Sequence, residues 1–267
     1  MQCVFTPIGV FRSDARYSYD VPRQGTLSAE GNGVVELLPG KGFAEAAADL
    51  AGFSRVWLIF LFDRNVGIWH PKVQPPRHVD HKVGVFATRS PYRPNPIGLT
   101  CAELVGVQGN KVFVKSHDLL DGTPILDLKP YLPYADAFPE ARAGWTEAPE
   151  LLYNIEYSEL AARQLAWLAA HGVSCLGQFI RTRLESEPLN AKRNRLVPEP
   201  QRPEGTPLLA YRTWRVRFVV DEALRTVRVL EVLSGYREEE LSPDAQDTYA
   251  DKQCHREFLA QFATPRR

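Results

Sequence analysis

Short apolar runs separated by turn-forming residues make up most of the first half of the chain. Short runs rich in Val, Ile and Phe that are bounded by Gly, Pro, Asn or Asp are typical of β-strands. We therefore predict mostly β structure from residue 5 to about residue 134. The clearest expected strands are 34–38, 56–62, 83–88, 100–107 and 112–116.

A tight turn and a single helix complete this pattern. Gly109 and Asn110 stand between two of the apolar runs, so residues 100–117 are expected to form a hairpin. The alanine-rich segment 43–50 lies between glycines, as is typical of a short helix. Many short strands with one connecting helix favour a small barrel or sandwich over a doubly wound α/β sheet.

The strand pattern ends near residue 142, and a different pattern follows. Residues 143–150 interrupt it and are interpreted as a linker. We therefore expect three parts: a mainly β barrel domain over 1–142, a smaller α+β domain over 151–233, and a tail over 234–267.

The smaller domain is expected to begin with two helices and to continue with strands. Ser158 is a suitable N-cap for a helix over 159–170, and a second helix is expected to open at Ser174. Residues 213–219 alternate between apolar and polar, which predicts a strand, and 225–233 can return antiparallel to it.

The tail combines an acidic run with an expected helix. The run is 238–240, and the helix is expected to begin at Ser242, which precedes a proline. Packing on the body of the protein, a dimer contact and disorder all remain open for this segment.

Composition narrows the possible functions. The chain has 267 residues, of which 44% are hydrophobic and 24% charged, enough for a substantial core. The formal net charge is +0, so affinity for nucleic acid would have to come from local basic patches. No apolar run approaches the length of a membrane span, and the first residues do not resemble a secretion signal. We therefore expect a cytoplasmic protein.

The cysteines and glycines exclude several common sites. Cys3, Cys101, Cys175 and Cys254 lack the spacing of a zinc site, so we expect free thiols and no metal. The chain contains neither a Gly-x-Gly-x-x-Gly fingerprint nor a P-loop. A Rossmann cofactor site is therefore disfavoured.

The most informative stretch is 83–98, where an apolar run leads into a loop that contains two arginines and three prolines. Each proline fixes its own φ and pushes the preceding residue toward extended geometry. Arg89, Arg93 and Asn95 are therefore presented with little conformational entropy left to lose on binding. The alternative is a proline-rich surface turn with incidental cations.

Several segments match one enzyme family in order and at close to its spacing. They are 22–24, 53–60, 84–90 with 93–98, 121–124, and 129–133. On these segments the chain resembles the TrmO family, also described as TsaA-like. Members of that family use S-adenosyl-L-methionine to methylate N6 of the threonylcarbamoyl-adenosine at position 37 of certain tRNAs.

The resemblance implies a compact β-barrel, a non-Rossmann cofactor site and a homodimer. Asp63 and Arg64 depart from the family pattern, where a His-Gln type pair is common, so their side-chain roles are in doubt. By similarity, the residues expected at the cofactor site are Pro22, Arg23, Gln24, Asp63, Arg64, Arg89, Leu99, Asp118, Leu119, Leu120 and Asp121.

The acceptor nitrogen is a weak nucleophile, so alignment with the methyl group and a positioned base would both help transfer. We expect Arg89, Arg93 and Asn95 to orient donor and acceptor, with Asp121 or Tyr131 handling the proton. The alternative for Asp121 is a turn, because Asp-Gly is a common turn dipeptide.

RNA contacts are expected mainly from the second domain, where cations would hold phosphates. The alternative is a solvated basic face. A splayed base would also need an aromatic platform, for which Tyr92, Tyr131 and Tyr134 are candidates. The expected RNA-binding residues are Arg181, Arg183, Lys192, Arg193, Arg195, Arg215 and Arg217.

Three functions are therefore open. The favoured one is methylation of threonylcarbamoyl-adenosine 37 in tRNA. A second keeps S-adenosyl-L-methionine and changes the acceptor. A third is a non-catalytic module that binds S-adenosyl-L-methionine or a nucleotide and regulates a partner.

Overall fold

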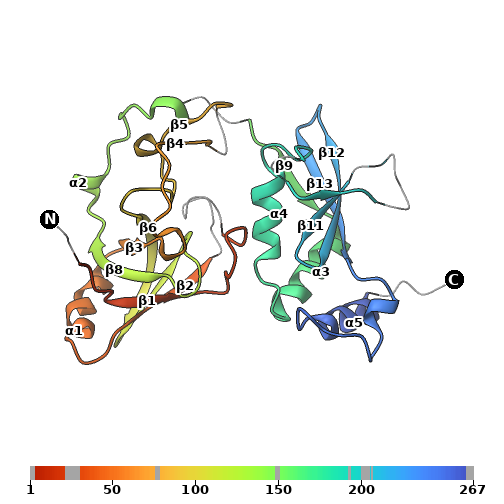
Figure 1. Cartoon of the computed structure of the whole chain (residues 1–267), viewed down its shortest axis with the longest axis horizontal. Helices are drawn as coiled ribbons and strands as arrows, with labels where there is room; N and C mark the ends of the chain where they lie inside the picture. Colours follow the sequence, from red (N-terminus) through yellow and green to blue (C-terminus); the bar gives the residue numbers. More distant parts are fainter. Residues whose placement is uncertain are drawn as a thin grey trace. The chain divides into compact units, whose positions relative to one another are not determined.

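The computed structural model divides the chain into two compact units, Met1–Glu150 and Leu151–Arg267 (Figure 1). The structure describes residues 4–21, 31–75, 79–147, 151–191, 194–199, 205 and 207–262. No helix in these ranges has the length and apolar character needed to cross a bilayer.

Unit 1 is built on a closed barrel of six antiparallel strands, in the order β1-β2-β7-β6-β3-β8. The expected barrel and the expected hairpin between β6 and β7 are both confirmed. The strands are β1 (Gly9–Arg12), β2 (Asn32–Leu37), β3 (Arg55–Leu61), β6 (Ile97–Gln108), β7 (Lys111–Lys115) and β8 (Pro124–Pro130).

Alternating side chains fill the barrel. In β3, Val56, Leu58 and Phe60 are buried in the core, while the residues between them are partly exposed. Gly98 lies against the Phe60 ring, so closely that an added Cβ would stand 2.3 Å from ring carbons. The alternation along the sequence thus decides which face of each strand enters the core.

The helix expected at 43–50 is shorter than predicted. The α-helix α1 (Phe43–Ala47) tightens into the 3-10 helix η2 (Ala48–Gly52). Three further short elements belong to unit 1: η3 (Asp63–Asn65), α2 (Pro133–Asp136) and η5 (Gly144–Thr146).

The prediction of a strand over 83–88 is wrong beyond its first two residues. Only β5 (Val83–Gly84) pairs, with β4 (Lys72–Val73), and the 3-10 turn η4 (Val85–Ala87) follows. The hydroxyl of Thr88 donates to the carbonyl of Val85 at 2.8 Å, which satisfies locally a group that a longer ladder would have used.

Unit 2 is a five-stranded sheet with helices, in the strand order β10-β11-β12-β13-β9. The expected antiparallel return is the β12–β13 pair, whereas β9 and β13 run parallel. The strands are β9 (Asn154–Tyr157), β10 (Leu196–Val197), β11 (Leu208–Tyr211), β12 (Trp214–Asp221) and β13 (Thr226–Ser234).

Two helices precede most of this sheet, as expected. Ser158 caps α3 (Glu159–Ala170) by accepting the backbone N–H of Ala161 at 3.0 Å. The second helix, α4 (Leu176–Leu184), begins one residue after Cys175, so Ser174 is not its cap.

The tail helix begins ten residues later than expected at Ser242. It is α5 (Lys252–Gln261), and the carboxylate of Asp247 accepts the backbone N–H of Lys252 at 3.2 Å. The segment nearer Ser242 forms the short 3-10 helix η6 (Glu239–Leu241) instead. The ring of His255 stacks on Trp214 with centroids 3.6 Å apart, so the tail packs on the body of unit 2.

Candidate functional site

A large cavity lies in unit 1 beside the proline-rich loop. Its volume is about 1350 Å³. It is lined by the β4–β5 segment, the loop after β5, and residues from more distant parts of unit 1. The lining includes Lys72, Lys82, Phe86, Arg89, Tyr92, Asp118 and Trp145.

Three residues singled out from the sequence line this cavity: Arg89, Asp118 and Tyr92. Burial raises the pKa of the Asp118 carboxyl, while a hydrogen bond from the Thr100 hydroxyl and the charge of Arg89 act in the opposite direction. The cavity therefore contains a carboxyl that ionises less readily than usual, with a cation close enough to affect it.

Arg93 is engaged within its own loop. Its Nη1 donates to the carbonyl oxygens of Val85 at 3.1 Å and Thr88 at 2.8 Å. Its guanidinium also lies 5.6 Å from the centroid of the Phe86 ring. Arg93 thus stabilises the η4 turn. Of the two arginines in this loop, Arg89 is the one that lines the cavity.

Asn95, Asp63 and Arg64 lie on the segments that follow β3 and precede β6. Asn95 is exposed, and its carbonyl accepts the backbone N–H of Ile97 at 2.7 Å. Arg64 donates to the carbonyl of Arg16 at 2.9 Å. This bond ties η3 to the loop that follows β1.

Asp121 lies elsewhere in unit 1, on a smaller cavity of about 420 Å³. Its carboxylate accepts the backbone N–H of Ser13 at 3.2 Å. Gly122 has φ 84°, and the backbone N–H of Thr123 bonds the carbonyl of Leu120, so a turn forms here. The Asp-Gly pair thus forms the turn that this dipeptide favours.

The remaining predicted residues of unit 1 are dispersed. Leu119 is buried in the barrel core at 1% exposure, whereas Leu99 is 53% exposed on β6. Tyr131 packs against Trp57, with ring centroids 5.9 Å apart. Pro22, Arg23 and Gln24, with Lys192 and Arg193 of unit 2, lie outside the described residues.

Sequence reasoning missed three aromatic residues that line the cavity, Phe62, Phe86 and Trp145. The indole N–H of Trp145 donates to the carbonyl of Ala87 at 2.9 Å, so the expected linker is anchored to the η4 turn. A tryptophan in a supposed linker was the available signal, because so large an apolar side chain rarely stays in water without a function.

Within the described ranges, no group of three or more His, Cys, Asp or Glu is placed to hold a metal ion. Cys101, Cys175 and Cys254 are free thiols and partly exposed.

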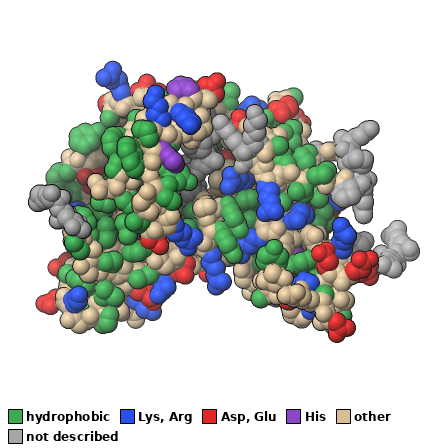
Figure 2. Space-filling model, in the orientation of Figure 1, with side chains coloured by type: hydrophobic (Ala, Val, Ile, Leu, Met, Phe, Trp, Pro, Cys, Tyr) green, Lys and Arg blue, Asp and Glu red, His purple; other side chains and the backbone are tan. Residues whose placement is uncertain are grey.

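The predicted RNA-binding arginines of unit 2 differ in their environments. Arg217 is paired with both Glu199 and Glu231, so its charge is largely neutralised. Arg181 is exposed, and Arg183 lies 5.5 Å from the ring centroid of Phe179. Figure 2 shows Lys and Arg side chains gathered over the part of unit 2 that carries α4.

Arg195 and Arg215 form a second basic pair. The charge of Arg195 adds to burial in lowering the pKa of Arg215, so the two cations lie near each other. Arg215 Nη1 also donates to the carbonyls of Arg212 and Trp214. The acceptors of Arg215 are thus backbone carbonyls, whereas those of Arg217 are carboxylates.

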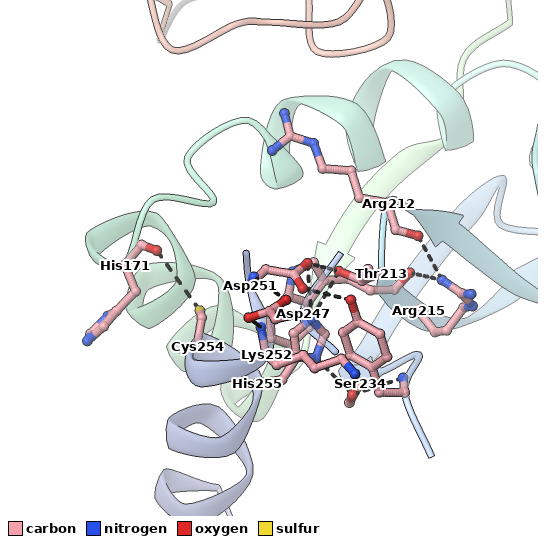
Figure 3. A network of polar contacts seen from close by, with 12 residues as sticks. His171, Arg212, Thr213, Arg215, Ser234, Asp247, Asp251, Lys252, Cys254 and His255 are labelled. Carbon is pink, nitrogen blue, oxygen red and sulfur yellow. Dashed lines mark hydrogen bonds and ion pairs between the residues drawn. The ribbon is translucent and has the colours of Figure 1, made fainter. Parts of the chain in front are cut away.

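A polar network fixes the tail beside this pair (Figure 3). Thr213 Oγ1 donates to Asp251 at 2.6 Å and lies 3.0 Å from Nε2 of His255, whose Nδ1 lies 2.8 Å from the Ser234 hydroxyl. Burial lowers the pKa of His255 to about 4, so the ring is neutral near pH 7. Figure 3 shows the Arg212 side chain pointing away from this network.

Comparison with known proteins identifies the family. A family model described as "tRNA-methyltransferase O N-terminal domain" matches residues 10–137. The "tRNA (adenine(37)-N6)-methyltransferase" of Escherichia coli K12 is 40% identical over 196 residues, which cover 71% of this chain and 83% of that protein. A Pseudomonas aeruginosa PAO1 protein, "Putative S-adenosylmethionine-dependent methyltransferase RcsF", is 44% identical over 60% of this chain and 70% of its own length.

A solved structure agrees with these likenesses. The crystal structure of TrmO from Pseudomonas aeruginosa matches with a TM-score of 0.63 and 33% identity, covering 88% of this chain and 99% of that chain. The β-barrel of unit 1 and these sequence and structural similarities place the protein among the β-barrel methyltransferases. The chain belongs to the tRNA-methyltransferase O family.

Proposed function

We propose that this protein transfers the methyl group of S-adenosyl-L-methionine to N6 of threonylcarbamoyl-adenosine at position 37 of tRNA. The observation that carries the proposal is the cavity in the family's barrel domain that Arg89 and Asp118 both line. The names of the E. coli and P. aeruginosa relatives support the donor and the acceptor adenine. The threonylcarbamoyl group comes from the resemblance described above.

The residues of the cavity suit this methyl donor. Its volume, about 1350 Å³, is larger than that of most small-molecule sites, so donor and acceptor nucleotide can be close together. The planar fork of Arg89 suits the donor's carboxylate. The indole of Trp145 provides a ring face suited to adenine.

The donor, when bound, supplies an electrophilic methyl group on a sulfonium. The residues of this chain must then orient the acceptor nitrogen and accept its proton. We assign Arg89 to orientation and Asp118 to the proton, because a buried carboxyl with a raised pKa is a better base near neutral pH than an ordinary one. Thr100 positions Asp118 through its hydroxyl.

The other predicted residues take different roles in this proposal. Arg93 positions the η4 turn through its bonds to Val85 and Thr88. Asp121 keeps the turn after β7 in place, and Tyr131 packs on Trp57 at the barrel surface. Proton handling therefore moves from Asp121 and Tyr131 to Asp118.

Unit 2 is proposed to hold the tRNA through phosphate contacts. We assign the phosphate contacts to Arg181, Arg195 and Arg215, because two carboxylates already pair with Arg217. Residues 1–142 would then be the catalytic domain and 151–233 the tRNA-contacting domain. A homodimer, which the family resemblance implies, and a cytoplasmic location, which we expect from the composition, complete the proposal.

Labelled methyl transfer to purified tRNA tests the proposal, with Asp118→Asn as the main variant. We expect Asp118→Asn to lower kcat by about 10²-fold or more, the usual contribution of a general base. Its affinity for S-adenosylhomocysteine, measured by calorimetry, should change little. Unchanged kcat in this variant would remove Asp118 from the proposed chemistry. Bound donor without transfer by the wild type would favour the binding-module alternative.

A further inference from the structure

Phe86 is an apolar ring held out in solvent at the rim of the cavity. Its side chain is 75% exposed although it belongs to the ordered η4 turn. Arg93 lies over the ring and bonds both Val85 and Thr88, so the turn that presents Phe86 is fixed from two sides. A ring that is already fixed loses little entropy when it stacks on a partner.

The surroundings of Phe86 indicate the chemistry of that partner. Tyr92 also lines the cavity and is 38% exposed, and its ring lies 5.4 Å from that of His70. Among the described lining residues, the basic ones are Lys72, Lys82 and Arg89, and the acidic one is Asp118. Exposed rings beside cations are suited to bases joined by phosphates.

Figure 2 shows the same mixture over β4 and β5 of unit 1, where Lys, Arg and His side chains lie among hydrophobic ones. Single-stranded nucleic acid is held by this combination, since bases stack on the rings and cations follow the backbone. A purely hydrophobic protein partner would not need the lysines, and a purely electrostatic phosphate contact would not need the rings.

We propose that Phe86 and Tyr92 stack on single-stranded nucleotides next to the target base, while Lys72 and Lys82 contact their phosphates. This inference rests on the proposed function and adds a tRNA-contacting surface within the barrel unit. The expected RNA contacts of unit 2 would position the tRNA, whereas this rim would hold the splayed nucleotides at the reaction site.

The test compares Phe86→Ala with the control Phe138→Ala. Phe138 belongs to unit 1, is 70% exposed, and is not among the residues that line the cavity. Three quantities are measured for each variant: Kd for tRNA at two salt concentrations, KM for tRNA in methyl transfer, and Kd for S-adenosylhomocysteine.

We expect Phe86→Ala to weaken tRNA binding and to raise KM by roughly 10-fold, the loss of one base stack. Phe86→Trp should restore both quantities, and Phe86→Leu should not. Lys72→Ala should weaken tRNA binding and reduce its salt dependence. Phe138→Ala should match the wild type, and the affinity for S-adenosylhomocysteine should be unchanged throughout.

Three results would overturn the inference. One is tRNA affinity in Phe86→Ala equal to that in Phe138→Ala. Another is a loss confined to S-adenosylhomocysteine, which would place the ring in the donor site. The third is a change of oligomeric state in Phe86→Ala by light scattering, which would make the ring a subunit contact. Failure of the proposed function is distinguishable, because the wild type itself would then fail to methylate tRNA.

Discussion

The indole N–H of Trp145 donates a hydrogen bond to the carbonyl oxygen of Ala87, with 2.9 Å between the two heavy atoms. Trp145 follows the residues matched by the family model, which end at 137, and Ala87 stands two residues before Arg89. The bond therefore anchors the segment after the barrel to the loop that supplies the cavity's arginine.

Removing the Trp145 side chain should weaken donor binding. Trp145→Ala leaves the Ala87 carbonyl without this donor and removes part of the cavity wall, so affinity for S-adenosylhomocysteine should fall by about 10-fold. Trp145→Phe keeps a ring and loses only the hydrogen bond, so its loss should be smaller. Calorimetry measures both, with Trp57→Phe as the control for a tryptophan at the barrel surface. Equal affinity in Trp145→Ala and the wild type would contradict this role.

Asp118 should make stability depend on pH in a defined direction. Its folded pKa lies above the ordinary value of 3.8, so the folded chain binds this proton more tightly than the unfolded chain. As pH rises from about 3.8 through the raised pKa, this group therefore lowers the free energy of unfolding. Asp118→Asn removes the effect.

Urea unfolding of the wild type and Asp118→Asn at pH 4 and pH 7 tests this. The stability of the variant relative to the wild type should be greater at pH 7 than at pH 4. A constant difference would show that the Asp118 carboxyl is not destabilised by burial. Other titrating groups contribute equally to both proteins and cancel in the difference.

His255 should make the stability of the protein depend on pH in the opposite direction. Its pKa falls from 6.5 to about 4 on folding, so protons bind the unfolded chain more readily between these values. The contribution of this group to the free energy of unfolding is fully present above pH 6.5 and is lost as the pH falls toward 4. The total loss is roughly 3 kcal/mol. Asp251 and Asp247 oppose the shift, while burial and Arg215 cause it.

The measurement is urea unfolding of the wild type and His255→Gln at pH 7 and pH 5. The variant should be less stable than the wild type at pH 7, because its side chain cannot reproduce the stacking on Trp214. The difference in stability between the two proteins should be smaller at pH 5. A gap that stays the same at both pH values would contradict a neutral, buried His255.

Gly98 should tolerate no side chain. An added Cβ would stand 2.3 Å from carbons of the Phe60 ring, which is buried in the barrel core. We expect Gly98→Ala to lower the free energy of unfolding by about 1 to 3 kcal/mol, the usual cost of overpacking. Gly52→Ala is the control, because a Cβ there would have no atom within 4 Å among those described. Similar stability of the two variants would contradict the close packing of Gly98.

The barrel was predictable because its strands alternate and its turns are marked. Val56, Leu58 and Phe60 enter the core at the spacing that the sequence shows, and Gly109 marks the hairpin turn with a φ of 57°. Arg89 could also be singled out, because prolines stiffen the loop that carries it.

Other features depend on particular side-chain contacts that the alternation of apolar and polar residues does not indicate. The strand expected over 83–88 is replaced by a turn because Thr88 and Arg93 bond the carbonyl of Val85. The tail helix begins near Asp247 and Asp251 rather than at Ser242, since packing of His255 on Trp214 decides which segment is helical. Local propensity carries no information about these partners.

The grouping of the site residues could not be predicted from the local sequence either. Arg89 and Asp118 are 29 positions apart in the sequence. Only the barrel brings them to one cavity, while it places the neighbouring Asp121 on another. The family resemblance made all three residues candidates, and the fold separates Asp121 from the other two.

Nucleoside mass spectrometry of reacted tRNA tests the central claim most directly. Wild-type protein and S-adenosyl-L-methionine would be incubated with tRNA that carries threonylcarbamoyl-adenosine and with tRNA from cells unable to make it. The account predicts a gain of one methyl group on threonylcarbamoyl-adenosine in the first pool and no methylated adenosine at position 37 in the second. Equal methylation of both pools, or methylation of a different nucleoside, would contradict it.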